Sequence, residues 1–263
     1  MTHTRPTLSA IVITRNEAHN LHDCLQSMHG LVDEIIVVDS QSTDATVAIA
    51  QQHGAKVAQP ADWPGFGPQK NRALDLVTCD WVFSIDADER VTPELATEIK
   101  QVLQAGTPEV AYKVPRLSSY CGKFIHHAGW QPDYVLRLFK RGTARFSDDL
   151  VHERVVTETN VLPLHHHLLH YSYLNFSQVL SKVNAYSTAS AMQAYARGKR
   201  SSVAGALGHG AWAFIRTYVI RRGFLDGAHG LALSISNAET SYYKYLKLWQ
   251  MQQMQQAEEA AQK

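Results

Sequence analysis

Two aspartates close an apolar strand, and this feature constrains the fold more than any other. The segment Val82–Glu89 reads Val-Phe-Ser-Ile-Asp-Ala-Asp-Glu, which predicts a short buried strand followed by Asp86 and Asp88. Side chains alternate along a strand, so residues spaced i, i+2 point the same way at its carboxyl end. Carboxylates there are costly unless a cation is held beside them, and a hard divalent ion with oxygen ligands suits them. A polar turn that merely ends the strand is the alternative for such a pair.

Two earlier apolar runs end in polar residues in the same way. Leu8–Thr14 is followed by Arg-Asn-Glu, and Glu34–Val38 is followed by Asp-Ser-Gln-Ser-Thr-Asp. Both runs are typical of buried parallel strands, and a helical pattern follows each, so the order predicts a doubly wound α/β sheet. Ligands of such sheets bind at the carboxyl ends of the strands. We therefore expect the acidic residues there to converge on one site: Glu17, Asp39, Asp44, Asp86 and Asp88.

The common phosphate-binding loops are missing from the sequence. The turn after the first strand lacks G-x-G-x-x-G, and G-x-x-x-x-G-K-[ST] occurs nowhere, which excludes a dinucleotide-binding dehydrogenase and a P-loop NTPase. Gly65-Phe66-Gly67 is more typical of a turn, because no strand leads directly into it. With metal rather than backbone amides neutralising the phosphates, an enzyme that uses a sugar nucleotide becomes the better candidate.

The order and spacing of four segments resemble the motifs of glycosyltransferase family 2, inverting enzymes of the GT-A fold: Ile11–Glu17, Val37–Asp44, Gln69–Arg72 and Ile85–Glu89. The resemblance implies an α/β, GT-A fold (doubly wound, nucleotide-diphospho-sugar transferase-like) with a C-terminal helical appendage. Later segments are similar to the bacterial branch of β-glucosyltransferases that act on the inner core of lipopolysaccharide: Gly129–Asp133, Arg137–Phe139, Val151–Glu153, His170–Tyr173 and Gly223–Gly227.

A pocket for a nucleotide-sugar donor and a metal follows from this resemblance. Asp39 matches a position that usually meets uracil, which favours UDP, and Arg72 can pair with phosphate in bidentate fashion. The metal, Mg2+ or Mn2+, would be held by Asp88 and Asp86, with His170 completing the shell unless it is a core histidine. The donor-binding residues implied are Thr14, Asn16, Glu17, Asp39, Ser42, Asp44, Asn71, Arg72, Asp86 and Ala87.

The acceptor hydroxyl needs a base, and the leaving group needs Lewis-acid help. The resemblance places the base downstream of the metal motif, where Glu153 is the matching residue. The commoner Glu-Asp pair of the family is absent at that point, so Asp149 remains an alternative catalytic residue, and so does Asp148.

Three residues are candidates for contact with the acceptor sugar. Trp130, framed by Gly and Pro-Asp, suits a loop that presents an aromatic face to a sugar, with Asp133 available for hydroxyl groups. Core packing is the alternative for the tryptophan. Arg137 lies between two leucines on a predicted strand, so its charge should face the cleft or the solvent, and the resemblance favours the cleft.

Composition sets the remaining expectations. The chain has 263 residues, enough for one large domain and an appendage, and its net charge of +1 gives no case for nucleic-acid binding. Three cysteines without C-x-x-C spacing suit a reducing cytosol, and no signal-peptide pattern precedes the first strand, so a cytoplasmic location is expected. The catalytic domain should cover 1–172, with a nucleotide-sugar half over 1–100 and an acceptor half over 101–172.

A helical region is expected over 173–263. Its stretch Val203–Ile220 is too interrupted for a transmembrane span, but its aromatic residues and the following Arg221-Arg222 suit a helix lying on anionic lipid. A helix that packs on the core is the alternative.

The features together predict a metal-dependent inverting glycosyltransferase. It would move a hexose, glucose by the resemblance, from a UDP-linked donor to a lipid-anchored saccharide of the lipopolysaccharide inner core. The enzyme would be peripheral at the cytoplasmic face of the inner membrane. The alternatives are transfer to another cell-envelope glycan, a nucleotidyltransferase that makes a sugar nucleotide, and a catalytically dead binding module. The oligomeric state does not follow from the sequence.

Overall fold

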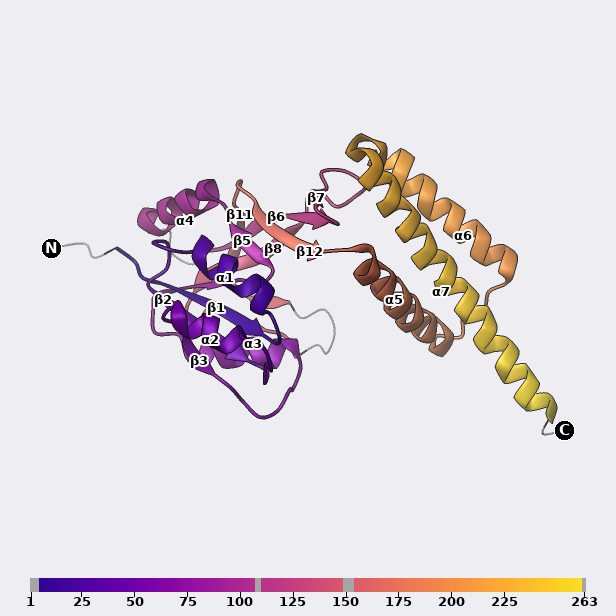
Figure 1. Ribbon diagram of the computed structural model, residues 1–263, viewed down its shortest axis with the longest axis horizontal. Coiled ribbons are helices and arrows are strands. Elements are labelled where there is room, and N and C mark those ends of the chain that lie inside the picture. The colour runs from indigo at the N-terminus through magenta and orange to yellow at the C-terminus, as the bar shows by residue number, and fades with distance from the viewer. Residues whose placement is uncertain (1–4, 107–109, 149–153, 262–263) are drawn as a thin grey trace. The chain divides into compact units, whose positions relative to one another are not determined.

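A computed structural model describes residues 5–106, 110–148 and 154–261 (Figure 1). The chain divides into two compact units, of which unit 1 is Met1–Leu117 with Pro132–His170, and unit 2 is Ser118–Gln131 with Tyr171–Lys263. The predicted boundary after residue 172 lies close to the start of the second segment of unit 2. The segment 118–131, which the sequence assigns to the catalytic domain, is grouped with the C-terminal helices instead.

A mixed sheet organises unit 1, and its strands follow the order β3-β2-β1-β4-β8-β6-β12-β5. β1 (Leu8–Thr14) pairs in parallel with both β2 (Glu34–Asp39) and β4 (Trp81–Ser84), so their carboxyl ends meet at one edge. The strands and the doubly wound order predicted from the sequence are confirmed. The other strands are β3 (Lys56–Ala58), β5 (Glu89–Val91), β6 (Val110–Tyr120), β7 (Lys123–Phe124), β8 (Tyr134–Lys140), β9 (Ala144–Phe146), β10 (Val155–Thr157), β11 (Asn160–Pro163) and β12 (Leu168–Tyr173).

Apolar side chains cover both faces of this sheet. Along β1, Ala10 and Val12 belong to one core and Ile11 to the other, as alternation along a buried strand requires. Because β1 is buried on both faces, its polar groups can reach solvent only at its ends. The helices of unit 1 are α1 (Ala18–Ser27), α2 (Thr46–Gln52), α3 (Phe66–Asp75) and α4 (Pro93–Ala105).

Unit 2 is mostly helical. It contains α5 (Phe176–Ala196), α6 (Val203–Ile215), the π-helical turn η1 (Arg216–Ile220), the 3-10 turn η2 (Gly223–Asp226) and α7 (Gly227–Ala261). These helices lie in the region over 173–263 that the sequence predicts to be helical, and no helix within the described residues is long and apolar enough to cross a membrane.

Close helix packing in unit 2 depends on glycine. A Cβ atom at Gly210 of α6 would lie 3.1 Å from the Cβ of Tyr242 on α7, and one at Gly230 would lie 1.8 Å from the carbonyl oxygen of Gly223. The second contact leaves no space for any side chain, so α7 can begin beside η2 only with glycine at position 230.

Candidate active site

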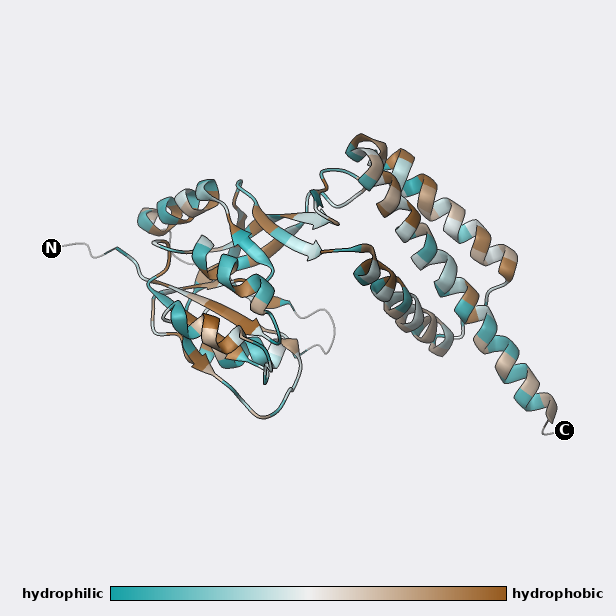
Figure 2. Cartoon of the chain, viewed as in Figure 1, coloured by the Kyte–Doolittle hydropathy of each residue, from teal (hydrophilic) through white to brown (hydrophobic). Residues whose placement is uncertain are grey.

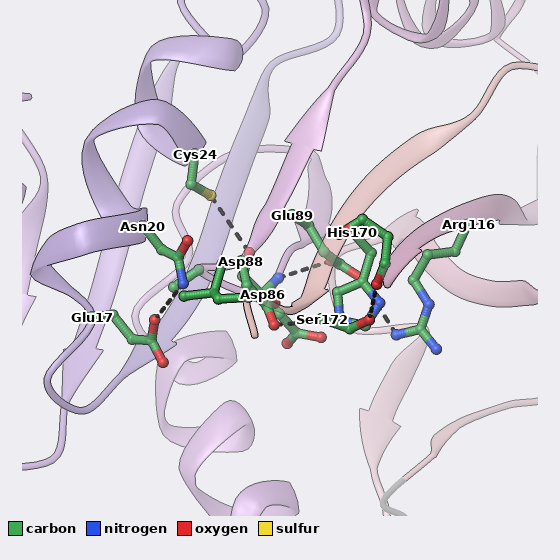
Figure 3. A network of polar contacts seen from close by, with 12 residues as sticks. Glu17, Asn20, Cys24, Asp86, Asp88, Glu89, Arg116, His170 and Ser172 are labelled. Carbon is green, nitrogen blue, oxygen red and sulfur yellow. Dashed lines mark hydrogen bonds and ion pairs between the residues drawn. The ribbon is translucent and has the colours of Figure 1, made fainter. Parts of the chain in front are cut away.

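The loop between β4 and β5 carries both aspartates of the predicted metal motif (Figure 3). The Asp86 amide donates a hydrogen bond to a Glu89 carboxylate oxygen at 2.9 Å, and the Glu89 amide donates to the Asp86 carbonyl at 2.9 Å. Ala87 is buried inside this turn, and the Cys24 thiol from α1 donates to the same carbonyl at 3.5 Å. The loop backbone is therefore fixed from several sides before any ligand is considered.

Two buried cations hold the Asp86 carboxylate. Arg137 Nη2 on β8 lies 2.5 Å from Asp86 Oδ2, and Lys70 Nζ on α3 lies 3.0 Å from Asp86 Oδ1. Burial alone would raise the pKa of Asp86, but the charges of Arg137 and Lys70 outweigh it and hold that pKa well below its usual range. Asp86 is thus ionised, and each of its oxygens already has a cationic partner.

Asp88 has a different neighbour. Its Oδ2 lies 3.3 Å from His170 Nε2, because β12 pairs antiparallel with β5 and sets His170 opposite Glu89. About a third of the Asp88 side chain is exposed, so a ligand can reach it. Within the described ranges, no three His, Cys, Asp or Glu residues are grouped closely enough to hold a metal by themselves. The pair nevertheless fits a magnesium-type site, which commonly takes one or two carboxylates and completes its shell with water and substrate phosphates.

Glu89, which the sequence interpretation missed, is the most buried member of the cluster. It has no exposed surface, and its Oε1 lies 2.6 Å from Arg137 Nη2 and 3.6 Å from Arg116 Nη1. Burial raises the pKa of Glu89, and the Arg137 charge acts in the opposite direction. Lys70 and Arg116 were missed as well. Lys70 stands inside the quoted Gln69–Arg72 motif, but its ion pair is visible only once α3 is placed beside the loop.

A second polar network joins the ends of β1 and β2. Asp39 is fully buried and accepts hydrogen bonds from the Thr14 hydroxyl at 3.0 Å, the Ser42 hydroxyl at 2.5 Å and the Ser42 amide at 2.9 Å. The Gln59 side-chain amide adds a fourth bond to the same carboxylate at 3.1 Å. These bonds fix the loop after β2 against the end of β1.

Asn16 and Asp44 lock the two loops together. Asn16 has a φ of 55°, in the left-handed region, and its side-chain oxygen accepts from the Thr43 amide at 2.8 Å. Asp44 accepts from the Thr46 amide at 3.0 Å and from the Ala18 amide at 3.2 Å, at the starts of α2 and α1. Its pKa is lowered chiefly by the Thr46 hydroxyl, which also donates to it.

Glu17 connects this network electrostatically to the acidic loop. Burial raises the pKa of Glu17, the Asn20 amide opposes the shift through a 3.0 Å hydrogen bond, and the negative charge of Asp88 adds to the increase. Figure 3 shows Glu17 and Asn20 on the side of the loop away from Arg116. These acidic residues follow β1, β2 and β4, whose carboxyl ends lie at one edge of the sheet.

Two predicted donor residues on α3 have protein partners. The Asn71 side chain donates to the Phe146 carbonyl and accepts from its amide, each at 2.9 Å, so it extends the pairing of β9. Arg72 Nη2 donates to both carboxylate oxygens of Asp62, at 3.0 and 2.7 Å, on the protein surface. A donor phosphate would have to compete with Asp62 for this guanidinium.

The predicted acceptor residues fall in different places. Arg137 is buried in the ion pairs described above rather than pointing into open space, and Asp133 lies 2.8 Å from Arg116. Trp130 belongs to unit 2, where its partly exposed ring stacks on Tyr173 with a centroid distance of 6.0 Å. The predicted bases Glu153 and Asp149 lie outside the described residues, and Asp148 is exposed.

Comparison with known proteins points to one family. The family "Glycosyl transferase family 2" matches residues 9–160. An uncharacterized glycosyltransferase of Rickettsia felis is 33% identical over 92% of this chain and 89% of its own length. The lipopolysaccharide core biosynthesis glycosyltransferase LpsC of Rhizobium meliloti is 35% identical over 73% of each chain.

Among solved structures, the glucosyl-3-phosphoglycerate synthase of Mycobacterium tuberculosis with Mn2+, UDP and its product aligns with 43% of this chain and 44% of its own. The identity is 27% and the TM-score 0.37, a partial likeness on which no ligand assignment depends. The match to the family over more than half of the chain, with relatives that align nearly end to end, shows that this chain belongs to glycosyltransferase family 2.

Proposed function

We propose that this glycosyltransferase moves a hexose, glucose in our assignment, from a UDP-linked donor to a lipid-anchored saccharide of the lipopolysaccharide inner core. The observation that carries the proposal is the Asp88–His170 pair, at the edge of the sheet where β1, β2 and β4 end. Next to it lies Asp86, which is ion-paired with Arg137. LpsC, the lipopolysaccharide core biosynthesis glycosyltransferase that is 35% identical to this chain, supports the acceptor class. The match of Asp39 to a uracil-reading position supports UDP.

Asp88 and His170 would hold a divalent metal, with Asp86 next to them. When bound, such an ion supplies Lewis-acid stabilisation of the negative charge that develops on the leaving nucleoside diphosphate. The chain's own residues prepare the surroundings. Arg137 and Lys70 neutralise Asp86, so the acidic loop can stand beside a diphosphate without two uncompensated carboxylates repelling it.

The remaining chemical step is removal of the proton from the acceptor hydroxyl. Glu153 is our proposed base, and Asp149 is its rival. As the hydroxyl oxygen attacks the anomeric carbon, its proton goes to the carboxylate and the bond to the diphosphate breaks, which inverts the configuration in one displacement.

We expect Glu153→Gln to lower transfer by about 100-fold or more while donor binding persists, because the amide keeps the shape but cannot accept a proton. The measurement is the transfer rate together with UDP-sugar affinity from calorimetry. Asp149→Asn and Asp148→Asn test the two rival bases in the same assay. If Asp149→Asn is inactive and Glu153→Gln is not, the base is Asp149.

A donor screen tests the proposed function as a whole. UDP-, GDP-, ADP- and CMP-linked sugars are incubated with the full chain and Mg2+ or Mn2+, and hydrolysis is followed with and without EDTA. We expect release of UDP from a UDP-hexose, abolished by EDTA and restored by excess metal. Turnover of a different nucleotide refutes the UDP assignment, and full activity in EDTA refutes the metal.

The proposed acceptor also implies where in the cell the enzyme acts. A lipid-anchored core saccharide is available at a membrane surface, so we propose that the enzyme acts as a peripheral protein at the cytoplasmic face of the inner membrane.

A further inference from the structure

The outer face of α6 and the turns after it expose large apolar side chains. Trp212 and Ile220 are 54% and 58% exposed, and the exposed residues recur at helical spacing along one side. The opposite side of α6 is lined by small buried residues that face α7. Figure 2 shows brown residues recurring along α6, whereas the C-terminal part of α7 is more teal. The apolar tip consists of Trp212, Ile215, Val219, Ile220, Phe224 and Leu225.

The charges around this tip have one sign. From Trp212 to Ala238 the sequence has a single acidic residue, Asp226, and three basic ones: Arg216, Arg221 and Arg222. Asp226 is 3% exposed and its carboxylate points inward, so it does not neutralise the surface. Arg216 and Arg222 are exposed among the apolar residues of the tip. An apolar face surrounded by cations complements an anionic lipid surface.

The inward carboxylate of Asp226 holds the segment that carries Trp130, a predicted acceptor-binding residue. It accepts hydrogen bonds from the His126 amide at 3.2 Å and the His127 amide at 2.9 Å, and His127 Nδ1 lies 3.2 Å away. The Ala128 amide donates to the Arg221 carbonyl at 2.8 Å. These bonds fasten the loop over 121–131, which carries Trp130, to the turn η2, and η2 also presents Phe224 and Leu225 to solvent.

Arg221 takes part in the same attachment. A Cβ atom at Gly129 would lie 2.4 Å from Arg221 Cδ, so the arginine side chain covers a glycine that must have none. Gly129 also has a φ of 80°, which glycine adopts without strain. Arg221 therefore has a structural contact in unit 2, and Arg216 and Arg222 are the better positions at which to test surface charge.

We propose that the tip of unit 2 docks on an anionic phospholipid bilayer, with Trp212, Ile220 and their neighbours entering the interface and Arg216 and Arg222 meeting lipid phosphates. Docking of this face brings the loop of Trp130 to the lipid surface, because η2 contributes Phe224 and Leu225 to the tip and its Asp226 binds that loop. The inference rests on the proposed lipid-anchored acceptor for its biological purpose, but the binding itself does not depend on that acceptor.

Vesicle co-sedimentation tests the docking without donor or acceptor, so failure here is separable from failure of the transferase assignment. Full-length protein is mixed with neutral phosphatidylcholine vesicles or with vesicles that also contain phosphatidylglycerol, at low and high salt. We expect binding to the anionic vesicles, weakened by salt. We expect Arg216→Glu with Arg222→Glu to weaken it about ten-fold or more. A matched control, Lys100→Glu with Arg141→Glu, changes exposed cations of unit 1 and should bind as the wild type does.

The apolar contact has its own readout. Trp212→Gln with Ile220→Gln should lower vesicle binding at least as strongly, whereas Leu162→Gln, which removes an exposed apolar residue of β11, should not. Lipids brominated in the acyl chains should quench tryptophan fluorescence in the wild type, and Trp212→Phe should lose most of that quenching. The proposal is wrong if the wild-type protein stays in the supernatant with anionic vesicles at low salt. It is also wrong if the tip variants bind the vesicles as tightly as the wild type does. A dimer in light scattering that Trp212→Gln dissociates, without vesicle binding, would assign the face to a second copy instead.

Discussion

Replacing Asp88 with asparagine is expected to lower hexose transfer roughly 1,000-fold, because the partly exposed carboxylate that faces His170 is the proposed metal ligand and its charge would be needed where the diphosphate leaves. The substitution keeps the side-chain shape, and Asp86 retains its ion pairs with Arg137 and Lys70, so folding should survive. Steady-state transfer measures the first effect. Mn2+ affinity, followed by electron paramagnetic resonance of the free ion, measures ligand loss independently of turnover.

A matched control separates a site effect from a general loss of charge. Asp75→Asn makes the same change at an exposed aspartate that is paired with Arg145. It should leave both the transfer rate and the Mn2+ affinity near the wild-type values. If Asp88→Asn binds Mn2+ as tightly as the wild type, the metal assignment is wrong even when transfer is lost.

Loss of Arg137 should have the largest effect on stability. Arg137→Met leaves the fully buried Glu89 without its close partner and leaves Asp86 with Lys70 alone. Removing one member of a buried ion pair costs about 3–5 kcal/mol of unfolding free energy, since the remaining charge stays in a low-dielectric environment. Urea unfolding followed by circular dichroism measures this change.

Two further variants decide whether the pairing itself is responsible. Arg145→Met breaks a solvent-exposed pair with Asp75 and should cost less than about 1 kcal/mol. Adding Glu89→Gln to Arg137→Met removes the stranded charge, so the double variant should recover part of the lost stability. A double variant no more stable than Arg137→Met alone would mean that packing of the arginine, and not its charge, accounts for the loss.

Local pattern was enough to predict the elements that carry the site. The apolar runs at 8–14 and 34–38 form β1 and β2, because burial of a strand on both faces produces a short continuous apolar run in the sequence. The region predicted to be helical from residue 173 contains α5, α6 and α7. Asp86 and Asp88 follow β4, but they lie in a turn rather than in extended strand, so strand alternation does not apply and the two carboxylates contact different partners. Local pattern could not predict the partners of these two aspartates, because the partners come from distant parts of the chain.

Arg137 is the clearest example. A charged residue between leucines on a strand was expected to face the cleft or the solvent, and a buried position between two carboxylates was not considered. β8 lies antiparallel to β4 and brings Arg137 to the loop that follows, so its environment depends on strand pairing that no local pattern records. Glu89 was overlooked for the same reason, although it directly follows the aspartate pair. The helical prediction past residue 203 was also incomplete, since the π-helical turn over 216–220 has no sequence signal that we recognised.

The contact between Gly230 and the Gly223 carbonyl has a consequence for the divergence of this lineage. Exposed residues of the tip can be exchanged one at a time, so their identities should drift between species with the lipids that each species makes. The two glycines have no such freedom, because a Cβ atom at 230 would lie 1.8 Å from the Gly223 carbonyl oxygen and one at 223 would lie 2.9 Å from the Thr217 carbonyl oxygen. Descendants that change every lipid-facing residue should therefore still keep this pair. In an alignment of distant relatives, two glycines seven positions apart would identify this turn even where the exposed residues of the tip have all been replaced.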